Sequence, residues 1–219
     1  MIRQVEPEIL ETLAPDDPAA IVGRADLRLI NAIMGNHRWL VRQALKHIQP
    51  GWRILELGAG DSTLAKLLLK AGACQPQDLW GVDLVSRPTN WPAQAHWIEG
   101  DMNQLPELPE AEVIIASLVL HHLDHPKLQQ LGQRWPCGCR LLLASEPARY
   151  PLHLLQGRAL SLAARLNHVT RHDILVSVNA GFRKNELLDS LGLPAWQGQV
   201  TESWLGAYRV VASPSSRLA

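Results

Sequence analysis

The chain has 219 residues, of which 47% are hydrophobic and 19% charged. These values suit one folded globular domain and exclude wholesale disorder. Lys plus Arg and Asp plus Glu both number 21, so the formal net charge is zero. Because proteins that bind phosphate backbones usually carry a basic excess, nucleic acid is a poor first candidate for the substrate.

The cysteine pattern and the short apolar runs predict a cytoplasmic protein. Cys74, Cys137 and Cys139 cannot form an even set of disulfides, and the last two lack the second cysteine pair of a structural zinc site. The amino terminus has no basic start followed by an apolar run, so no signal peptide is expected. The longest apolar stretch, Val113 to Leu120, is too short to span a bilayer.

Two helices are expected before the first strand. Residues 15–18 combine prolines with acids that suit the positive end of a helix dipole, and apolar residues at helical spacing follow until Gly35. Asn36 is expected to cap a second helix that runs to about Ile48. We therefore expect residues 1–50 to form a helical extension or lid ahead of the main domain.

From residue 51 onwards, strands and helices alternate, as they do in a parallel sheet with helices on both faces. The five strands expected in this region are 52–57, 79–83, 95–99, 112–117 and 140–145. This alternation predicts a doubly wound α/β domain over residues 51–219.

The rhythm changes after the fifth strand. A helix is expected from Pro151 to Leu166, and residues 167–181 have an ambiguous pattern, so a helical insertion is expected at about 148–182. A short helix over residues 184–191 follows. The last two expected strands lie close enough in sequence to pair as a hairpin, at 197–203 and 207–212.

The segment Ile54–Asp61 carries the strongest functional signal. Gly58 and Gly60 follow the first strand, where glycines allow a turn and let the backbone approach a nucleotide-like ligand. The phosphate-binding form of this motif needs a third glycine, and Thr63 stands in its place. Glu56 would repel a pyrophosphate but attract an ammonium group. The electrostatics therefore favour S-adenosylmethionine over NAD.

Two further carboxylates follow the next strands. Asp83 ends the second strand, where its side chain can accept hydrogen bonds from both hydroxyls of a ribose. Asp101 follows the third strand and could accept from the adenine amino group. A tight turn explains the glycines, and a strand cap explains each acid, when each is taken alone. Three such features at the ends of three consecutive strands favour a cofactor site.

These segments, with Ala116–Leu123 and Leu141–Glu146, resemble the successive motifs of class I S-adenosylmethionine-dependent methyltransferases over about residues 50–146. The resemblance implies a Rossmann-like, seven-stranded, mostly parallel sheet whose last strand runs antiparallel. It also implies S-adenosyl-L-methionine as the cofactor. The residues implied are Glu56, Gly58 and Gly60 at its methionine part, Asp83 at its ribose, and Asp101 with Met102 at its adenine, with Ser117 as a further cofactor residue.

Three histidines are candidates for the general base that a hydroxyl acceptor needs. Methyl transfer from a sulfonium depends largely on in-line positioning, and a base with a pKa near neutrality helps to remove the acceptor's proton. His121 and His122 follow the fourth strand, with His122 favoured, and His172 lies in the ambiguous segment. Helix capping or packing explains the first two equally well, and a surface position explains His172 better. The segment Leu120–Leu123 is similar to small-molecule methyltransferases of the group that includes ubiquinone-pathway enzymes.

The sequence therefore predicts a methyltransferase acting on a small, hydrophobic or phenolic molecule, with oxygen favoured over carbon or nitrogen as the acceptor atom. No metal is expected, because the spacing of Asp101, Asp124 and Glu146 does not mark a metal site. Three alternatives stay open: an inactive cofactor-binding homologue that acts as a regulatory subunit, an NAD-linked oxidoreductase, and an RNA methyltransferase. Thr63 and Glu56 count against NAD, and the neutral net charge counts against RNA.

Overall fold

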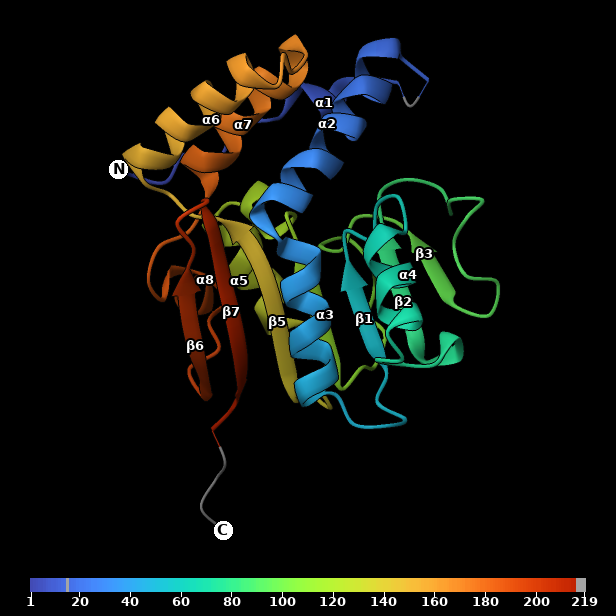
Figure 1. Ribbon diagram of the computed structural model, residues 1–219. Helices are drawn as coiled ribbons and strands as arrows, with labels where there is room; N and C mark the ends of the chain where they lie inside the picture. The colour runs from blue at the N-terminus through green and yellow to red at the C-terminus, as the bar shows by residue number, and fades with distance from the viewer. Residues whose placement is uncertain (15, 216–219) are drawn as a thin grey trace.

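Seven strands form one sheet, in the spatial order β3-β2-β1-β4-β5-β7-β6 (Figure 1). The computed structural model describes residues 1–14 and 16–215, so Pro15, from the predicted helix start, lies outside the described residues. The strands are β1 (Ile54–Leu57), β2 (Leu79–Asp83), β3 (His96–Glu99), β4 (Val113–Ser117), β5 (Leu141–Pro147), β6 (Trp196–Glu202) and β7 (Ala207–Pro214).

The strand directions are those of a doubly wound sheet closed by a hairpin. β1 to β5 run parallel to one another, whereas β7 runs antiparallel to both β5 and β6. All of β5 and nearly all of β4 are buried, as expected for strands covered on both faces. The predicted seven-stranded, mostly parallel α/β fold is confirmed.

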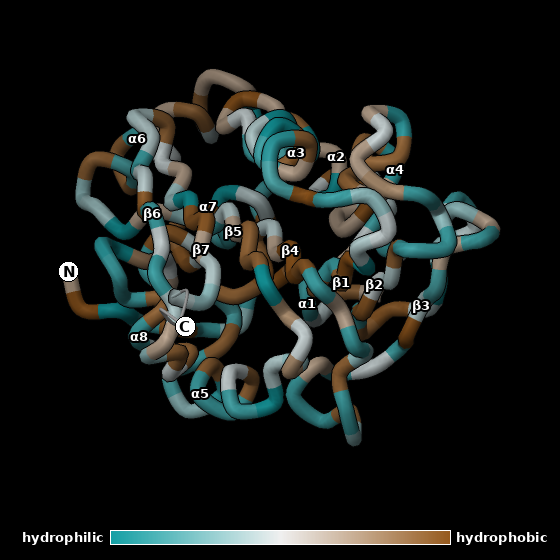
Figure 2. The backbone as a smooth tube through the Cα atoms, turned by 90° about the horizontal axis from the view of Figure 1, so that it is seen from below, coloured by the Kyte–Doolittle hydropathy of each residue, from teal (hydrophilic) through white to brown (hydrophobic). Residues whose placement is uncertain are grey.

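Helices cover both faces of this sheet. Figure 2 shows α3 (Asn36–His47) and α4 (Thr63–Lys70) on one side of the row of strands, and α5 (His125–Gln133) and α8 (Glu186–Leu191) on the other. Each pair of helices buries leucines in its own apolar core against the sheet. The parallel strands are therefore enclosed, and their carboxyl ends are the edge left for a ligand.

A second group of helices lies above those carboxyl ends (Figure 1). It consists of α1 (Ile9–Thr12), α2 (Pro18–Met34), α6 (Pro151–Ala163) and α7 (His168–Ala180), and α7 contacts the other three. By contrast, α3 packs against β5 and α4, on the face of the sheet. Of the extension predicted over residues 1–50, the part that precedes α3 lies above the carboxyl ends, and its role as a lid stays a prediction.

The junction between α2 and α3 follows the sequence prediction in one respect and departs from it in another. Gly35 ends α2 with a left-handed backbone, at a φ of 67°. The prediction that Asn36 caps α3 is wrong, because Gly35 is the N-cap and Asn36 is the first helical residue. The side chain of Asn36 is buried instead, where it accepts a hydrogen bond from the Ser145 hydroxyl at 3.1 Å. That bond ties α3 to β5.

The ambiguous segment 167–181 is helical. The side chain of Asn167 accepts a hydrogen bond from the Thr170 N–H at 2.8 Å and caps α7. Two short 3₁₀ helices complete the fold, η1 (Pro76–Asp78) and η2 (Leu120–His122). Within the described part of the chain, none of the helices has both the length and the apolar character that crossing a membrane requires.

Candidate active site

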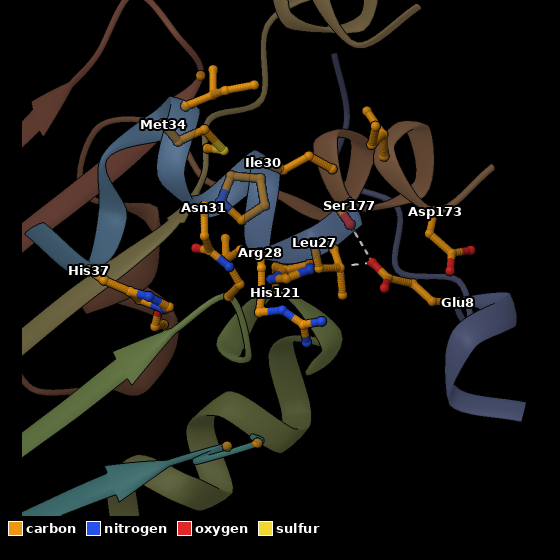
Figure 3. Close-up of a pocket in the computed structure, with 18 of the residues that line it drawn as sticks. Glu8, Leu27, Arg28, Ile30, Asn31, Met34, His37, His121, Asp173 and Ser177 are labelled. Carbon is orange, nitrogen blue, oxygen red and sulfur yellow. Dashed lines mark hydrogen bonds and ion pairs between the residues drawn. The ribbon is translucent and has the colours of Figure 1, made fainter. Parts of the chain in front are cut away.

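A cavity of about 450 Å³ separates the carboxyl ends of β1 and β4 from the helices above them. The turn after β1 and the end of β4 line one side, and α2, α6 and α7 line the other. Figure 3 shows Leu27, Ile30 and Met34 of α2 gathered around this space, with Glu8 and Ser177 on its far side. The ends of the strands therefore form one side of the cavity, and the helices form the other.

Glu56 is the buried acid of the sheet side. It lies within β1, it is only 3% exposed, and its Oε2 has no hydrogen-bond partner among the described residues. Burial raises the pKa of this carboxyl well above its ordinary value, and the nearby carboxylates of Asp83 and Asp61 raise it further. An unpaired carboxyl in a closed site is costly unless a cation or a hydrogen-bond donor reaches it.

The glycine turn after β1 has a backbone that glycine suits best. Gly58 and Gly60 have φ angles of 64° and 52°. A Cβ on Gly58 would lie 2.5 Å from Cγ2 of Val119, so this glycine is also needed for packing against the turn after β4. The N–H of Gly60 donates to the Asp83 carboxylate at 2.8 Å, which joins the turn to the end of β2.

The other predicted cofactor residues lie at the strand ends where they were expected, but their contacts are local. Asp83 also accepts from the N–H of Val85, and Asp101 accepts from the N–H of Asn103. Met102 is buried in the apolar core. Ser117 lines the cavity, and its hydroxyl is buried without a partner among the described residues. The binding roles of these residues stay predictions.

His121 is enclosed by two carboxylates. Its Nδ1 lies 2.8 Å from Oε2 of Glu146, and its Nε2 lies 3.5 Å from Oε1 of Glu8. The N–H groups of Val119, Leu120 and His121 donate to the same Glu146 carboxylate, which fixes its position. Burial lowers the pKa of His121, but the two carboxylates outweigh it and raise the pKa to about 9.

The other two predicted bases have different surroundings. His122 lines the cavity beside His121, with the ring centroids 4.1 Å apart, and its Nδ1 lies 3.0 Å from Oε1 of Glu11. His172 has a half-exposed side chain whose Nδ1 lies 2.9 Å from Oδ1 of Asp173. Asp173 lines the cavity, but His172 is not among the residues that line it. The structure thus brings two of the three histidines to the cavity.

The helix side of the cavity is mainly apolar. The hydrophobic residues that line it from α2, α6 and α7 are Leu27, Ile30, Ile33, Met34, Leu160, Ile174 and Val178, and Leu205, from the turn between β6 and β7, also lines the cavity. The same helices contribute the polar residues Arg24, Arg28, Asn31, His153, Gln156, Asp173 and Ser177, although most of the lining surface is apolar. Such a surface suits an acceptor that is itself largely apolar.

Glu8 is the site residue that the sequence did not reveal. It precedes α1, it is 6% exposed, and its carboxylate accepts a hydrogen bond from the Ser177 hydroxyl of α7. The local signal around it is the reciprocal capping pattern with Glu11, which marks a helix start and says nothing about His121 or Ser177, each more than 100 residues away in sequence. Only the packing of the amino-terminal segment on η2 and α7 brings Glu8 to the site.

No protein-family model matches the sequence, and no curated protein matches it either. Solved structures do match its fold. Human N-acetylserotonin methyltransferase (ASMT) in complex with SAM gives a TM-score of 0.57 at 19% identity, over 93% of this chain and 60% of that chain. The plantazolicin methyltransferase BpumL with SAH and a triazolic analogue gives 0.65 at 11% identity, over 90% and 92%. The N-methyltransferase NodS from Bradyrhizobium japonicum WM9 in complex with SAH gives 0.52 at 14% identity, over 93% and 91%.

The chain has the methyltransferase fold. It spans about three fifths of the length of ASMT and of the pyocyanin biosynthetic protein PhzM, but about nine tenths of BpumL and of NodS in its SAH complex. The methyltransferase fold places a ligand at the carboxyl ends of its parallel strands, where the cavity of this chain also lies. At these identities the likeness defines the fold alone.

Proposed function

We propose that this protein is an S-adenosylmethionine-dependent methyltransferase acting on a small, largely apolar molecule. The observation that carries this proposal is the unpaired, buried carboxyl of Glu56 beside a glycine turn at the end of β1. A phosphate cofactor would place negative charge against Glu56, whereas an amino-acid ammonium would neutralise it. NAD-linked oxidation is therefore disfavoured.

The residues present fit the cofactor. Glu56 would hold the ammonium group, Gly58 and Gly60 would admit the methionine part close to the backbone, and the buried Ser117 hydroxyl offers a further polar partner. Asp83, at the end of β2, keeps unused acceptor capacity for ribose hydroxyls. When bound, S-adenosylmethionine supplies a methyl group on a positively charged sulfur, which leaves as a neutral thioether after transfer. The ASMT, BpumL and NodS structures are complexes with SAM or SAH.

The acceptor is proposed to be a hydrophobic or phenolic molecule that is methylated on oxygen. When an acceptor binds against the apolar lining from α2, α6 and α7, its own apolar surface is removed from water. This burial gives affinity without recognition of a charge. Activation of a hydroxyl is assigned to His121 and His122, because these two of the three predicted bases line the cavity. In this role His121, whose pKa is raised to about 9, would take the acceptor's proton at Nε2 only in its neutral form, so turnover that depends on it should rise as the pH increases toward 9, while Glu146 holds the ring in place.

The helix α2 is proposed to act as a lid over the cofactor. Arg28 of α2 pairs with Asp61 of the glycine turn at 3.2 Å, and both side chains are about half exposed. Such an exposed pair contributes at most about 1 kcal/mol, so it can open as a ligand enters. A cytoplasmic location is also proposed, since all three cysteines are free thiols.

Calorimetry with the purified protein tests the proposal. S-adenosylhomocysteine and S-adenosylmethionine should both bind, and each should raise the Tm through mass action. Binding of NAD without binding of either would refute the proposal. Binding of the cofactor with no methyl transfer to a panel of phenolic, amine and carbon acceptors would favour an inactive homologue with a regulatory role.

A further inference from the structure

Glu8, His121 and His122 offer three metal-ligand atoms that all lie within 4.8 Å of one another. We propose that this cluster binds a divalent first-row transition-metal ion where the amino-terminal segment and η2 line the cavity, which is the side proposed for the acceptor. Glu8 comes from the amino-terminal segment and the histidines come from η2, and all three line the cavity. Two imidazoles and one carboxylate form a ligand set that catalytic zinc sites use, with a position left open for water or substrate.

Both histidines are held at the ring nitrogen that an ion would not use. Glu146 lies 2.8 Å from Nδ1 of His121, and Glu11 lies 3.0 Å from Nδ1 of His122. The available nitrogen of each ring is therefore Nε2. Histidines that bind a metal usually donate their other ring N–H to a carboxylate or a carbonyl, which fixes the tautomer and the ring orientation. Both rings of this cluster have that arrangement.

The Nε2 of His121 is a buried polar atom that needs a partner. The side chain is 3% exposed, and this nitrogen has no hydrogen-bond partner among the described residues. The nearest carboxylate oxygen, Oε1 of Glu8, is 3.5 Å away, beyond the usual range of about 2.7–3.2 Å. Figure 3 shows this carboxylate between Ser177 and His121. An ion held by both groups would satisfy the nitrogen and the carboxylate together.

The supporting groups are rigid and supply negative charge. Three backbone N–H groups fix Glu146, and the Ser177 hydroxyl donates to Glu8. With Glu11, three carboxylates surround two imidazoles. When both imidazoles are neutral, as metal ligation requires, a divalent ion offsets two of these negative charges.

The use of such an ion follows from its place in the cavity and rests on the proposed function, but it replaces the general-base role, because Nε2 of His121 cannot hold the ion and accept a proton at the same time. An acceptor hydroxyl that coordinates the ion would lose its proton to solvent at a lower pH than the free hydroxyl does. The oxygen would then form a bond to the methyl carbon as the carbon–sulfur bond breaks, with the electron pair of that bond staying on sulfur. Binding of the ion itself does not depend on this reaction.

Metal analysis of the 219-residue chain without an affinity tag tests the proposal. After metal depletion and equilibration with Zn²⁺, mass spectrometry should find one ion per chain, and Co²⁺ should give the visible absorption of a low-coordinate site. Glu8→Gln and His122→Gln should each weaken Zn²⁺ binding by roughly 100-fold. His172→Gln is the matched control, because His172 also has Nδ1 on a carboxylate but lies outside the cluster. That variant should bind Zn²⁺ like the unmodified protein.

Binding of S-adenosylhomocysteine, measured on the same samples, shows that each variant is folded and separates the two proposals. A protein that binds S-adenosylhomocysteine but holds no Zn²⁺ would overturn the metal site and leave the methyltransferase proposal intact. Equal Zn²⁺ affinity in His122→Gln and His172→Gln would overturn it as well. A protein that holds Zn²⁺ at this cluster but binds no S-adenosylhomocysteine would instead overturn the proposed function.

Discussion

Replacing Glu56 with glutamine tests the electrostatic basis of the cofactor site. The substitution keeps the size of the side chain and removes its negative charge. In the free protein this carboxyl is buried and unpaired, with a raised pKa. The structure therefore predicts two opposite effects of Glu56→Gln, a weaker affinity for a ligand with an ammonium group and a more stable free protein.

The loss of affinity can be scaled from the buried position of the carboxylate. A hydrogen bond to a charged group contributes about 1.5–3 kcal/mol. That range corresponds to a rise in Kd of roughly 10- to 150-fold, since about 1.4 kcal/mol is a factor of ten. The carboxyl must also lose its proton before it pairs with the ammonium, and this cost moves the expected effect toward the lower end. Adenosine, which has no amino-acid part, should bind both proteins equally.

The sign of the stability effect follows from the raised pKa. Because the folded protein binds this proton more tightly than the unfolded chain does, the free energy of unfolding falls as pH rises from about 4.5, the ordinary pKa of glutamate, to the raised pKa. The Glu56→Gln protein lacks this decrease in the free energy of unfolding. Its Tm should therefore exceed that of the unmodified protein at neutral pH and approach it near pH 4. For the same reason, cofactor binding should release a proton and strengthen with pH inside this window.

Calorimetry in buffers of different ionisation enthalpy measures both the affinity and the proton release. Glu99→Gln is a suitable control, because Glu99 also ends a strand at this edge but is exposed. If Glu56→Gln bound S-adenosylhomocysteine as tightly as the unmodified protein, the electrostatic reasoning would be refuted. The same conclusion would follow from equal losses of adenosine and S-adenosylhomocysteine affinity.

Three further predictions address other residues. Asp83→Ala should weaken S-adenosylhomocysteine and adenosine alike by about 1–3 kcal/mol, the cost of unpaired buried polar groups, as titration of both ligands would show. Gly58→Ala should lower stability in denaturant by about 1–3 kcal/mol through its clash with Val119, and Gly60→Ala, where no atom lies closer than 3.9 Å to the added Cβ, should cost less. His121→Gln should lower kcat by about 10²–10⁴ without changing cofactor affinity, and unchanged turnover with the true acceptor would make this histidine structural.

The elements of the sheet could be predicted because their signals are local. β2 has the predicted bounds, Leu79–Asp83, since turn-forming residues flank a short apolar run. The helix α7 could not be assigned with the same rules. It buries Val169, Thr170, Asp173 and Val178, among others, on more than one side, so it has no single apolar stripe. Helical structure there depends on contacts with α1, α2 and α6.

The two halves of the cavity differ in the same way, because one depends on local sequence signals and the other on long-range contacts. The half proposed for the cofactor is built from strand ends and the turns that follow them, so short segments of sequence were enough to predict Glu56 and the glycine turn there, and Asp83, which bonds to that turn. The acceptor half depends on contacts that no local pattern encodes. Arg3, for example, donates to the carbonyls of Ala180, His121 and Leu123, and these bonds draw the amino-terminal segment across η2.

Those long-range bonds explain why the acceptor half of the cavity was harder to predict from the sequence than the cofactor half. Glu8 reaches His121 only because Arg3 anchors its segment on η2, and because the N–H groups of Ile9 and Leu10 donate to Asp173 of α7. Arg3→Ala should therefore disturb the acceptor side while sparing the glycine turn after β1. Its KM for the acceptor should rise several-fold, with S-adenosylhomocysteine affinity within about twofold of the unmodified protein. A parallel loss of both affinities would show that the two halves of the cavity are not separable.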